Sequence, residues 1–161
     1  SSGLVGSEMC IRDRFNVYLN VSLPELGNKY FKGAVDLFNE LNVNKEKHVL
    51  CHNDLDSSNV MFKNNKIVFI DFEYLSINSK YSDLSKLIDS LNLKTLEKNK
   101  LLKGYGINDI NDGINIKIKK WSLMNIYTEL IWANYINEYK RNYFDKDYIN
   151  LLKNKIKQQK Q

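Results

Sequence analysis

The stretch HNDLDSSNVMFKNNKIVFID, residues 52–71, gathers side chains that suit the chemistry of phosphate. Asp54 supplies a carboxylate, Asn59 an amide, and Asp71 a second carboxylate at the end of an apolar run. Transfer of a γ-phosphoryl group asks a protein mainly for positioning and charge neutralisation. One carboxylate can accept the proton of an attacking hydroxyl, and amide and carboxylate oxygens are hard ligands for Mg²⁺. We therefore predict that Asp54 is a base and that Asn59 and Asp71 bind Mg²⁺ beside ATP.

The spacing of these residues matches the catalytic loop of kinases, H-x-D-x-x-x-x-N. His52, Asp54 and Asn59 occupy its three fixed positions, and Asp71 follows twelve residues after Asn59, where a metal-binding aspartate is expected. The alternative is a surface loop rich in Asn and Asp beside an ordinary hairpin, because these residues favour turns through local hydrogen bonds.

Short strands and a tight turn must position this loop. VLC before it and NVMF after it have the composition of strands, and Asn64-Asn65 predicts the turn to a further strand, KIVFI, that returns Asp71 to the loop. A loop is predicted at Ser76-Ile77-Asn78. Apolar spacing predicts helices over Pro24–Leu41, from near Ser82 or Asp83, and over Thr95–Lys103, Ile116–Lys140 and Lys146–Lys157.

The sequence CHNDLDSSNVMF, followed by IDFEYLSINSKYSDLSKLI, resembles the choline/ethanolamine kinases, within the group that includes the aminoglycoside phosphotransferases. The resemblance covers about residues 30 to 140 and is most specific between Val49 and Asp83. The H-N-D and D-F-E-Y spellings are typical of the choline/ethanolamine branch. The residues that match the family pattern are Cys51, His52, Asn53, Asp54, Asn59, Ile70, Asp71, Phe72, Glu73, Tyr74, Asn78 and Asp83.

The resemblance implies the same roles for Asp54, Asn59 and Asp71 as the spacing does. It groups His52 with the catalytic residues, as a brace for the loop. It implies that Asp83 is a buried aspartate that holds the loop by hydrogen bonds. Glu73 has two interpretations, contact with a metal-bound water at the cofactor site or pairing with a neighbouring cation. Asp89 lies near a position where acidic residues recognise the amine in relatives, and a surface charge on a helix is equally plausible.

The long helix near the C-terminus carries the candidate substrate residues. Thr128, Trp132, Tyr135 and Tyr139 share one face, and aromatic rings bind quaternary ammonium groups such as that of choline. Trp132 matches a family tryptophan, whereas Glu129 stands where better-known members have another. This departure leaves open other acceptors, namely an aminoglycoside, thiamine or a sugar alcohol. Core packing is the alternative explanation of the aromatic stripe.

These elements predict a mostly helical α+β fold, the C-terminal lobe of the protein-kinase-like fold, with a small β-hairpin that carries the catalytic and metal-binding loops. We expect one compact unit over residues 15–161. Residues 1–14 lack hydrophobic periodicity, which predicts that they are a non-native leader, either adaptor read-through or an expression scar. No Gly-rich loop or phosphate-binding lysine precedes His52, so we expect the N-terminal lobe to be missing and this piece alone to be inactive. A non-catalytic lobe is therefore a further alternative.

Composition excludes several other classes of protein. The net charge is +5, but Lys greatly outnumbers Arg and no compact basic patch appears, which argues against a nucleic-acid partner. The two cysteines favour a reduced, cytoplasmic setting over a disulfide framework, and two isolated histidines argue against zinc. No apolar stretch is long enough for a transmembrane segment. The expected partners are a small-molecule substrate and ATP, and the oligomeric state is left open.

Overall fold

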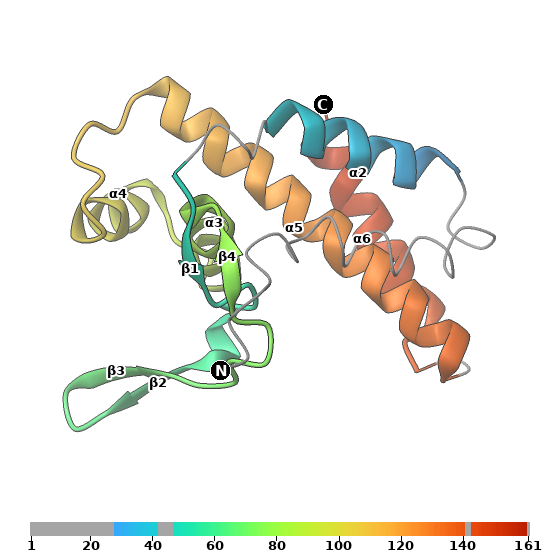
Figure 1. The fold of residues 1–161 in the computed structure, drawn as a ribbon, viewed down its shortest axis with the longest axis horizontal. Coiled ribbons are helices and arrows are strands. Elements are labelled where there is room, and N and C mark those ends of the chain that lie inside the picture. Colours follow the sequence, from blue (N-terminus) through green and yellow to red (C-terminus); the bar gives the residue numbers. More distant parts are fainter. Residues whose placement is uncertain (1–27, 42–46, 141–142, 161) are drawn as a thin grey trace, which may run out of the picture. The chain divides into compact units, whose positions relative to one another are not determined.

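The structure is a computed structural model that describes residues 28–41, 47–140 and 143–160. Most of these residues are helical, and the strands form two separate two-stranded antiparallel sheets (Figure 1). The predicted α+β class is therefore confirmed. The prediction of a single compact unit is not confirmed, because the chain divides into two compact units. One is Lys45–Ser122, and the other is made of Ser1–Asn44 with Leu123–Gln161. The predicted leader, residues 1–14, and the first residues of the Pro24–Leu41 helix lie outside the described residues.

In the unit Lys45–Ser122, strand β1 (Val49–Cys51) pairs with β4 (Ser76–Asn78) in antiparallel register, Cys51 opposite Ser76. The prediction of a loop at Ser76–Asn78 is wrong. Three residues are too few to show the alternation of apolar and polar side chains that indicates a strand. This strand forms because it pairs with β1, which is distant in sequence. Helix α3 (Lys80–Ser90) follows β4 directly and packs against β1. Cys51 is buried in this interface and forms no disulfide, and its Sγ donates to the carbonyl of Ser79 at 3.4 Å.

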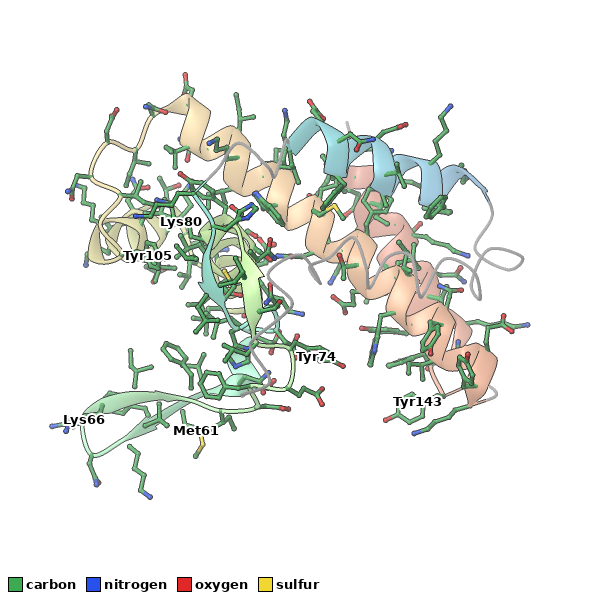
Figure 2. The ribbon with its side chains drawn as sticks, in the orientation of Figure 1. Met61, Lys66, Tyr74, Lys80, Tyr105 and Tyr143 are labelled. Atoms are coloured by element: carbon green, nitrogen blue, oxygen red, sulfur yellow. The ribbon has the colours of Figure 1, made fainter. Side chains whose placement is uncertain are left out.

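The second sheet of this unit is the predicted hairpin. Strand β2 (Val60–Lys63) pairs with β3 (Lys66–Phe69), with Val60 opposite Phe69 and Lys63 opposite Lys66. Asn64 and Asn65 both have positive φ, 51° and 58°, as a two-residue type I′ turn requires. The side chains of β3 are all exposed, so only the base of the hairpin is joined to the rest of the unit (Figure 2).

Three further helices lie close to their predicted positions, and two of them begin earlier than expected. Helix α3 begins at Lys80 because Ser79 caps it, its hydroxyl accepting a hydrogen bond from the Tyr81 N–H. Helix α4 spans Thr95–Gly104. Helix α5 (Asp112–Tyr139) begins four residues before Ile116, since the side chain of Asn111 accepts the N–H of Ile114. Because glycine disfavours a helix, Gly113 led the sequence analysis to predict a later start.

In the other unit, α2 (Asn28–Leu41) and α6 (Lys146–Gln159) lie beside the C-terminal part of α5 (Figure 1). The buried face of α2 has the predicted spacing, with Tyr30, Ala34 and Leu37 in the core. The approach of α2 to α5 depends on Gly33, because a Cβ there would lie 2.5 Å from the Tyr127 hydroxyl. None of the described helices combines the length and apolar character that crossing a bilayer requires.

Candidate active site

The loop from His52 to Asn59 begins where β1 ends, and Asp83 on α3 holds its first two peptide groups. The N–H of His52 donates to Asp83 Oδ2 at 2.7 Å, and the N–H of Asn53 donates to Oδ1 at 2.8 Å. Burial raises the pKa of the Asp83 carboxyl above its ordinary value of 3.8, although these two N–H groups oppose the rise. One carboxylate on a helix thus fixes the backbone at the start of the loop.

The raised pKa of Asp83 predicts how its contribution to stability changes with pH. The folded protein binds this proton more tightly than the unfolded chain does, so raising the pH through the ordinary value of 3.8 and then through the raised pKa removes stability. Urea unfolding of the complete gene product that contains these residues should be measured for wild type and Asp83→Asn between about pH 3 and pH 7. We expect the wild-type advantage over the variant to shrink as the pH rises. An advantage that grows with pH would mean that the loop N–H groups outweigh burial.

Asn53 connects the loop to β4 and to the turn that precedes it. Its φ is 63°, a left-handed conformation that Asn tolerates better than most residues. Its Nδ2 donates to the carbonyls of Cys51 and Tyr74, at 3.1 and 3.0 Å, and to the Ser76 hydroxyl at 2.9 Å. Its Oδ1 accepts from the buried Asn78 at 2.7 Å. Tyr74 lies where the chain passes from the hairpin to β4 (Figure 2). The side chain of Asn53 thus closes the base of the loop.

His52 is buried and contacts the segment around Asp71 rather than Asp54. Its Nε2 lies 2.8 Å from the carbonyl oxygen of Ile70, and its ring packs on Phe72 with centroids 4.9 Å apart. Because Nε2 must donate in this pair, Nδ1 carries no proton in neutral imidazole, and it has no hydrogen-bond partner among the described residues. His52 therefore contacts the residues on both sides of Asp71, through the Ile70 carbonyl and the Phe72 ring, which is the geometry of a brace.

The structure brings Asp54 and Asn59 into contact and places Asp71 next to the residue that pairs with Asn59. Asn59 Nδ2 donates to the backbone carbonyl of Asp54 at 2.9 Å and to its Oδ2 at 3.2 Å. The N–H of Ile70 donates to the carbonyl of Asn59 at 3.1 Å, so that Asp71 is the next residue beyond this pair. Asp71 is exposed and has a φ of 63°. Glu73 is also exposed, two residues further along.

The donor set at Asn59 and Asp71 fits Mg²⁺. Both hydrogen bonds of the Asn59 amide come from Nδ2 and neither uses Oδ1, and Asp71 offers an exposed carboxylate. Among the described residues no group of three or more His, Cys, Asp or Glu side chains could hold a metal ion. Mg²⁺ does not need such a cage, since it keeps several waters and uses one or two protein ligands beside phosphate oxygens.

Lys86 is a member of the site that the sequence did not reveal. Its Nζ lies 2.7 Å from Oδ1 of Asp54. Lys86 follows Asp83 by three residues on α3, so the two side chains share one face of the helix. The three-residue spacing from Asp83 could have indicated that Lys86 belongs to the site. In a lysine-rich chain, however, this lysine is not distinctive unless the contact between the loop and α3 is known.

Asp56, in the same loop, has a structural role. It caps the short 3-10 turn Ser57–Asn59, its side chain accepting from the Ser58 N–H at 2.9 Å. Burial acts to raise its pKa, but the hydrogen bonds from Ser58, the charge of Lys86 and the Ser57 hydroxyl together hold this pKa below its ordinary value of 3.8. The carboxylate of Asp56 therefore stabilises the turn that presents Asn59.

The candidate substrate residues have partners of their own. Asp89 accepts a hydrogen bond from the Ser122 hydroxyl at 2.5 Å, which ties α3 to the N-terminal half of α5 within the same unit. In the other unit, the Tyr148 hydroxyl of α6 donates to Glu129. Trp132 packs on Phe144, with ring centroids 5.2 Å apart. Trp132 and Glu129 lie in a different compact unit from Asp54.

The aromatic stripe on α5 lies outside the fully buried face of that helix. The fully buried residues of this part of α5 are Met124, Tyr127, Leu130, Ile131 and Ala133. Thr128, Trp132 and Tyr135 are half-buried, and Tyr139 is 63% exposed. Trp132 instead joins a cluster with Phe144 and Tyr148, whose rings stack with centroids 5.0 Å apart.

Comparison with known proteins bears on this arrangement. Residues 20–90 match the model of the choline/ethanolamine kinase family. A curated relative, the protein LicA homolog of Metamycoplasma hominis, is 36% identical over 102 residues, which cover 60% of this chain and 39% of that protein. Over residues 20–90 the chain is therefore similar to the choline/ethanolamine kinases. The predicted resemblance is thus confirmed by sequence, over the segment that holds the loop, the hairpin and α3.

Solved structures share the kinase fold of this family. A choline/ethanolamine kinase family protein from Mesorhizobium loti superposes with a TM-score of 0.75 at 16% identity, covering 92% of this chain and 53% of its own. Choline kinase LicA from Streptococcus pneumoniae gives 0.74 at 18% identity, covering 91% and 53%. LicA in complex with AMP gives 0.68 at 18% identity, with the same coverage. The chain spans about half the length of these structures, and the fold is that of a lobe of the kinase.

Proposed function

We propose that the complete protein is an ATP-dependent phosphotransferase that phosphorylates the hydroxyl of a small amino alcohol, choline or ethanolamine. The observation that carries this proposal is the convergence of Asp54, Asn59 and Asp71 on one loop and hairpin base. In the reaction, the acceptor hydroxyl donates its proton to Asp54 as its oxygen attacks the γ-phosphorus in line. The bond from that phosphorus to the bridging oxygen breaks, and ADP leaves.

Asn59 and Asp71 are the residues that would hold Mg²⁺ in this protein. Bound there, the ion supplies neutralisation of the charge on the nucleotide's phosphate oxygens. His52 would keep Asp71 in place through Ile70, and Asp83 would keep the peptide groups before Asp54 in place. Glu73 is a further candidate at this cofactor site, through a metal-bound water. The complex of LicA with AMP supports a nucleotide partner for the family.

An apolar surface on the hairpin supports a nucleotide-covering lobe. Phe62 and Ile67, cross-strand partners on one face of the hairpin, are 74% and 63% exposed, which is unusual for large apolar side chains. We propose that residues 15–161 act as the C-terminal lobe and that a preceding lobe covers this surface when the nucleotide is bound. In the same proposal, residues 1–14 are a leader without a catalytic role.

The proposed acceptor follows from the cluster on α5 and α6. Trp132, Phe144 and Tyr148 provide aromatic surface, and the carboxylate of Glu129 is bound to Tyr148. Aromatic faces and a nearby carboxylate both favour a cationic ammonium group. Choline and ethanolamine are also the acceptors named for related proteins. Asp89, hydrogen-bonded to Ser122, is a weaker candidate for amine recognition than Glu129 because its carboxylate links two helices.

An acceptor screen tests this proposal. The complete gene product should be assayed with ATP and Mg²⁺ against choline, ethanolamine, thiamine, an aminoglycoside and a sugar alcohol, with the phosphorylated product detected by mass spectrometry. We expect kcat/KM for choline or ethanolamine to exceed the others by about 100-fold or more. Trp132→Ala should raise the acceptor KM about tenfold while the KM for ATP stays within about twofold. Preference for another acceptor would correct the substrate, and no turnover of any acceptor would favour a non-catalytic lobe.

A further inference from the structure

We propose that Lys86 is a catalytic residue that contacts the transferred phosphoryl group while it remains bound to Asp54. This inference rests on the proposed function and deepens it, because it adds a cation from α3 to a site otherwise built on the loop and the hairpin. Lys86 lies one turn of helix after Asp83. Helix α3 thus carries two groups for the same loop, Asp83 for the backbone and Lys86 for the reactive side chain.

The two oxygens of Asp54 are occupied differently. Oδ2 accepts from Asn59 Nδ2 at 3.2 Å, a long hydrogen bond, whereas Oδ1 accepts from Lys86 Nζ at 2.7 Å. An ionised carboxylate has about four lone-pair sites, so either oxygen can still receive the acceptor hydroxyl. Wherever that hydroxyl binds, an ammonium group lies on the same carboxylate. Asp54 therefore presents its substrate next to a fixed positive charge.

Distances place the transferred group within reach of Lys86. A hydroxyl bound to the base lies at about 2.6 to 3.2 Å from it. The phosphorus lies about 3 to 3.5 Å beyond the hydroxyl oxygen in a reactive arrangement. An ammonium group has three N–H donors on a flexible four-carbon stem. One N–H of Lys86 can keep its bond to Asp54 while another donates to an equatorial oxygen of the phosphoryl group.

A purely structural ion pair is a weaker account of Lys86. The side chains of Lys86 and Asp54 are 24% and 33% exposed, and ion pairs that water reaches contribute little to stability. The loop is already held by Asp83 through two backbone N–H groups and by Asn59. These bonds hold the conformation of the loop without Lys86. The proposed phosphoryl transfer, in contrast, requires a positive charge at this position.

The charge requirement of the reaction matches this position. As the acceptor O–P bond forms and the bond to the bridging oxygen breaks, negative charge spreads over the three equatorial oxygens. The acceptor proton passes to Asp54, and ADP departs with the bonding electron pair. Lys86 stays protonated throughout and donates hydrogen bonds only. A preorganised cation that faces this charge stabilises the transition state more than the ground state.

Kinetics of Lys86→Met and Lys86→Arg in the complete gene product test the proposal, with Lys80→Met as the matched control. Lys80 lies on the same helix, with its ammonium over the rings of Tyr81 and Tyr105 (Figure 2). We expect Lys86→Met to lower kcat about 30- to 100-fold with the acceptor KM within about threefold, and Lys86→Arg to retain kcat within about fivefold. Lys80→Met should leave kcat within about twofold. A kcat for Lys86→Met of at least half the wild-type value would overturn the proposal, as would a change confined to the acceptor KM.

A binding measurement keeps the proposal testable if Lys86→Met folds poorly. Lys86→Gln should weaken binding of a non-hydrolysable ATP analogue with Mg²⁺ about five- to tenfold and leave ADP binding unchanged, because only the analogue carries a γ-phosphoryl group. Equal effects on both nucleotides would contradict the proposal. The Asp54→Asn variant distinguishes failure of the proposed role of Lys86 from failure of the proposed function. If that variant is inactive while Lys86 is dispensable, the phosphotransferase stands and the role of Lys86 falls.

Discussion

Asp54→Asn in the complete gene product should lower kcat by about 10³-fold or more with little change in the KM for ATP. The amide cannot accept the acceptor proton, and general-base catalysis alone contributes about 10² to 10⁴ in rate. Asn has the shape of Asp, so its Oδ1 can still accept from Lys86. Asn59 would then face an amide N–H₂ group, but it keeps its 2.9 Å bond to the backbone carbonyl of residue 54. The loss should therefore be chemical, and it should be measured by product formation at saturating ATP and acceptor.

Asp56→Asn is the matched control for this result. It makes the same change in charge two residues away on the same loop, and Asn caps a turn as well as Asp does. Its kcat should stay within about threefold of wild type, because the carboxylate of Asp56 binds the Ser58 N–H rather than the reactants. Comparable turnover by Asp54→Asn and wild type would remove the basis of the proposed function.

Local sequence predicted the parts of the site that depend on neighbours along the chain. The hairpin follows from two short apolar runs around Asn64-Asn65, residues that tolerate the positive φ of a tight turn. The register of that hairpin then brings Asp71 to Asn59 without further information, because Ile70 must pair with residue 59. Spacing and turn chemistry together were sufficient to predict this part of the structure.

Long-range pairing explains what the sequence did not reveal. Strand β4 was predicted as a loop because its pairing with β1 spans more than twenty residues of chain. Lys86 was missed for the same reason, since its partner, Asp54, is 32 residues away in sequence. The roles of Glu129 and Asp89 could not be read from residue type alone. A carboxylate on a helix looks the same in sequence whether or not it accepts a hydrogen bond from a distant hydroxyl, as Glu129 does from Tyr148 and Asp89 from Ser122.

The second large effect is expected at Asp71, where Asn should lower kcat/KM by about 10³-fold at a magnesium concentration that half-saturates the wild type. Asn is the informative substitution because residue 71 has a φ of 63°, which Asn tolerates better than Ala. The backbone and the His52 contacts therefore stay, while a neutral amide oxygen replaces the carboxylate as a ligand. Raising the magnesium concentration should recover part of the activity, which loss of a base such as Asp54 would not allow.

Calorimetry separates metal binding from folding at this position. Wild type should bind ADP more tightly when Mg²⁺ is present, and Asp71→Asn should lose most of that difference while its affinity for ADP without the ion is unchanged. Asp109→Asn makes the same change in charge in an exposed loop and should leave both affinities unaltered. If Asp71→Asn kept the wild-type dependence on Mg²⁺, Asp71 would not be a metal ligand. The hairpin would then serve only to carry the Ile70 carbonyl to His52, and the ion would have to be held by other oxygens.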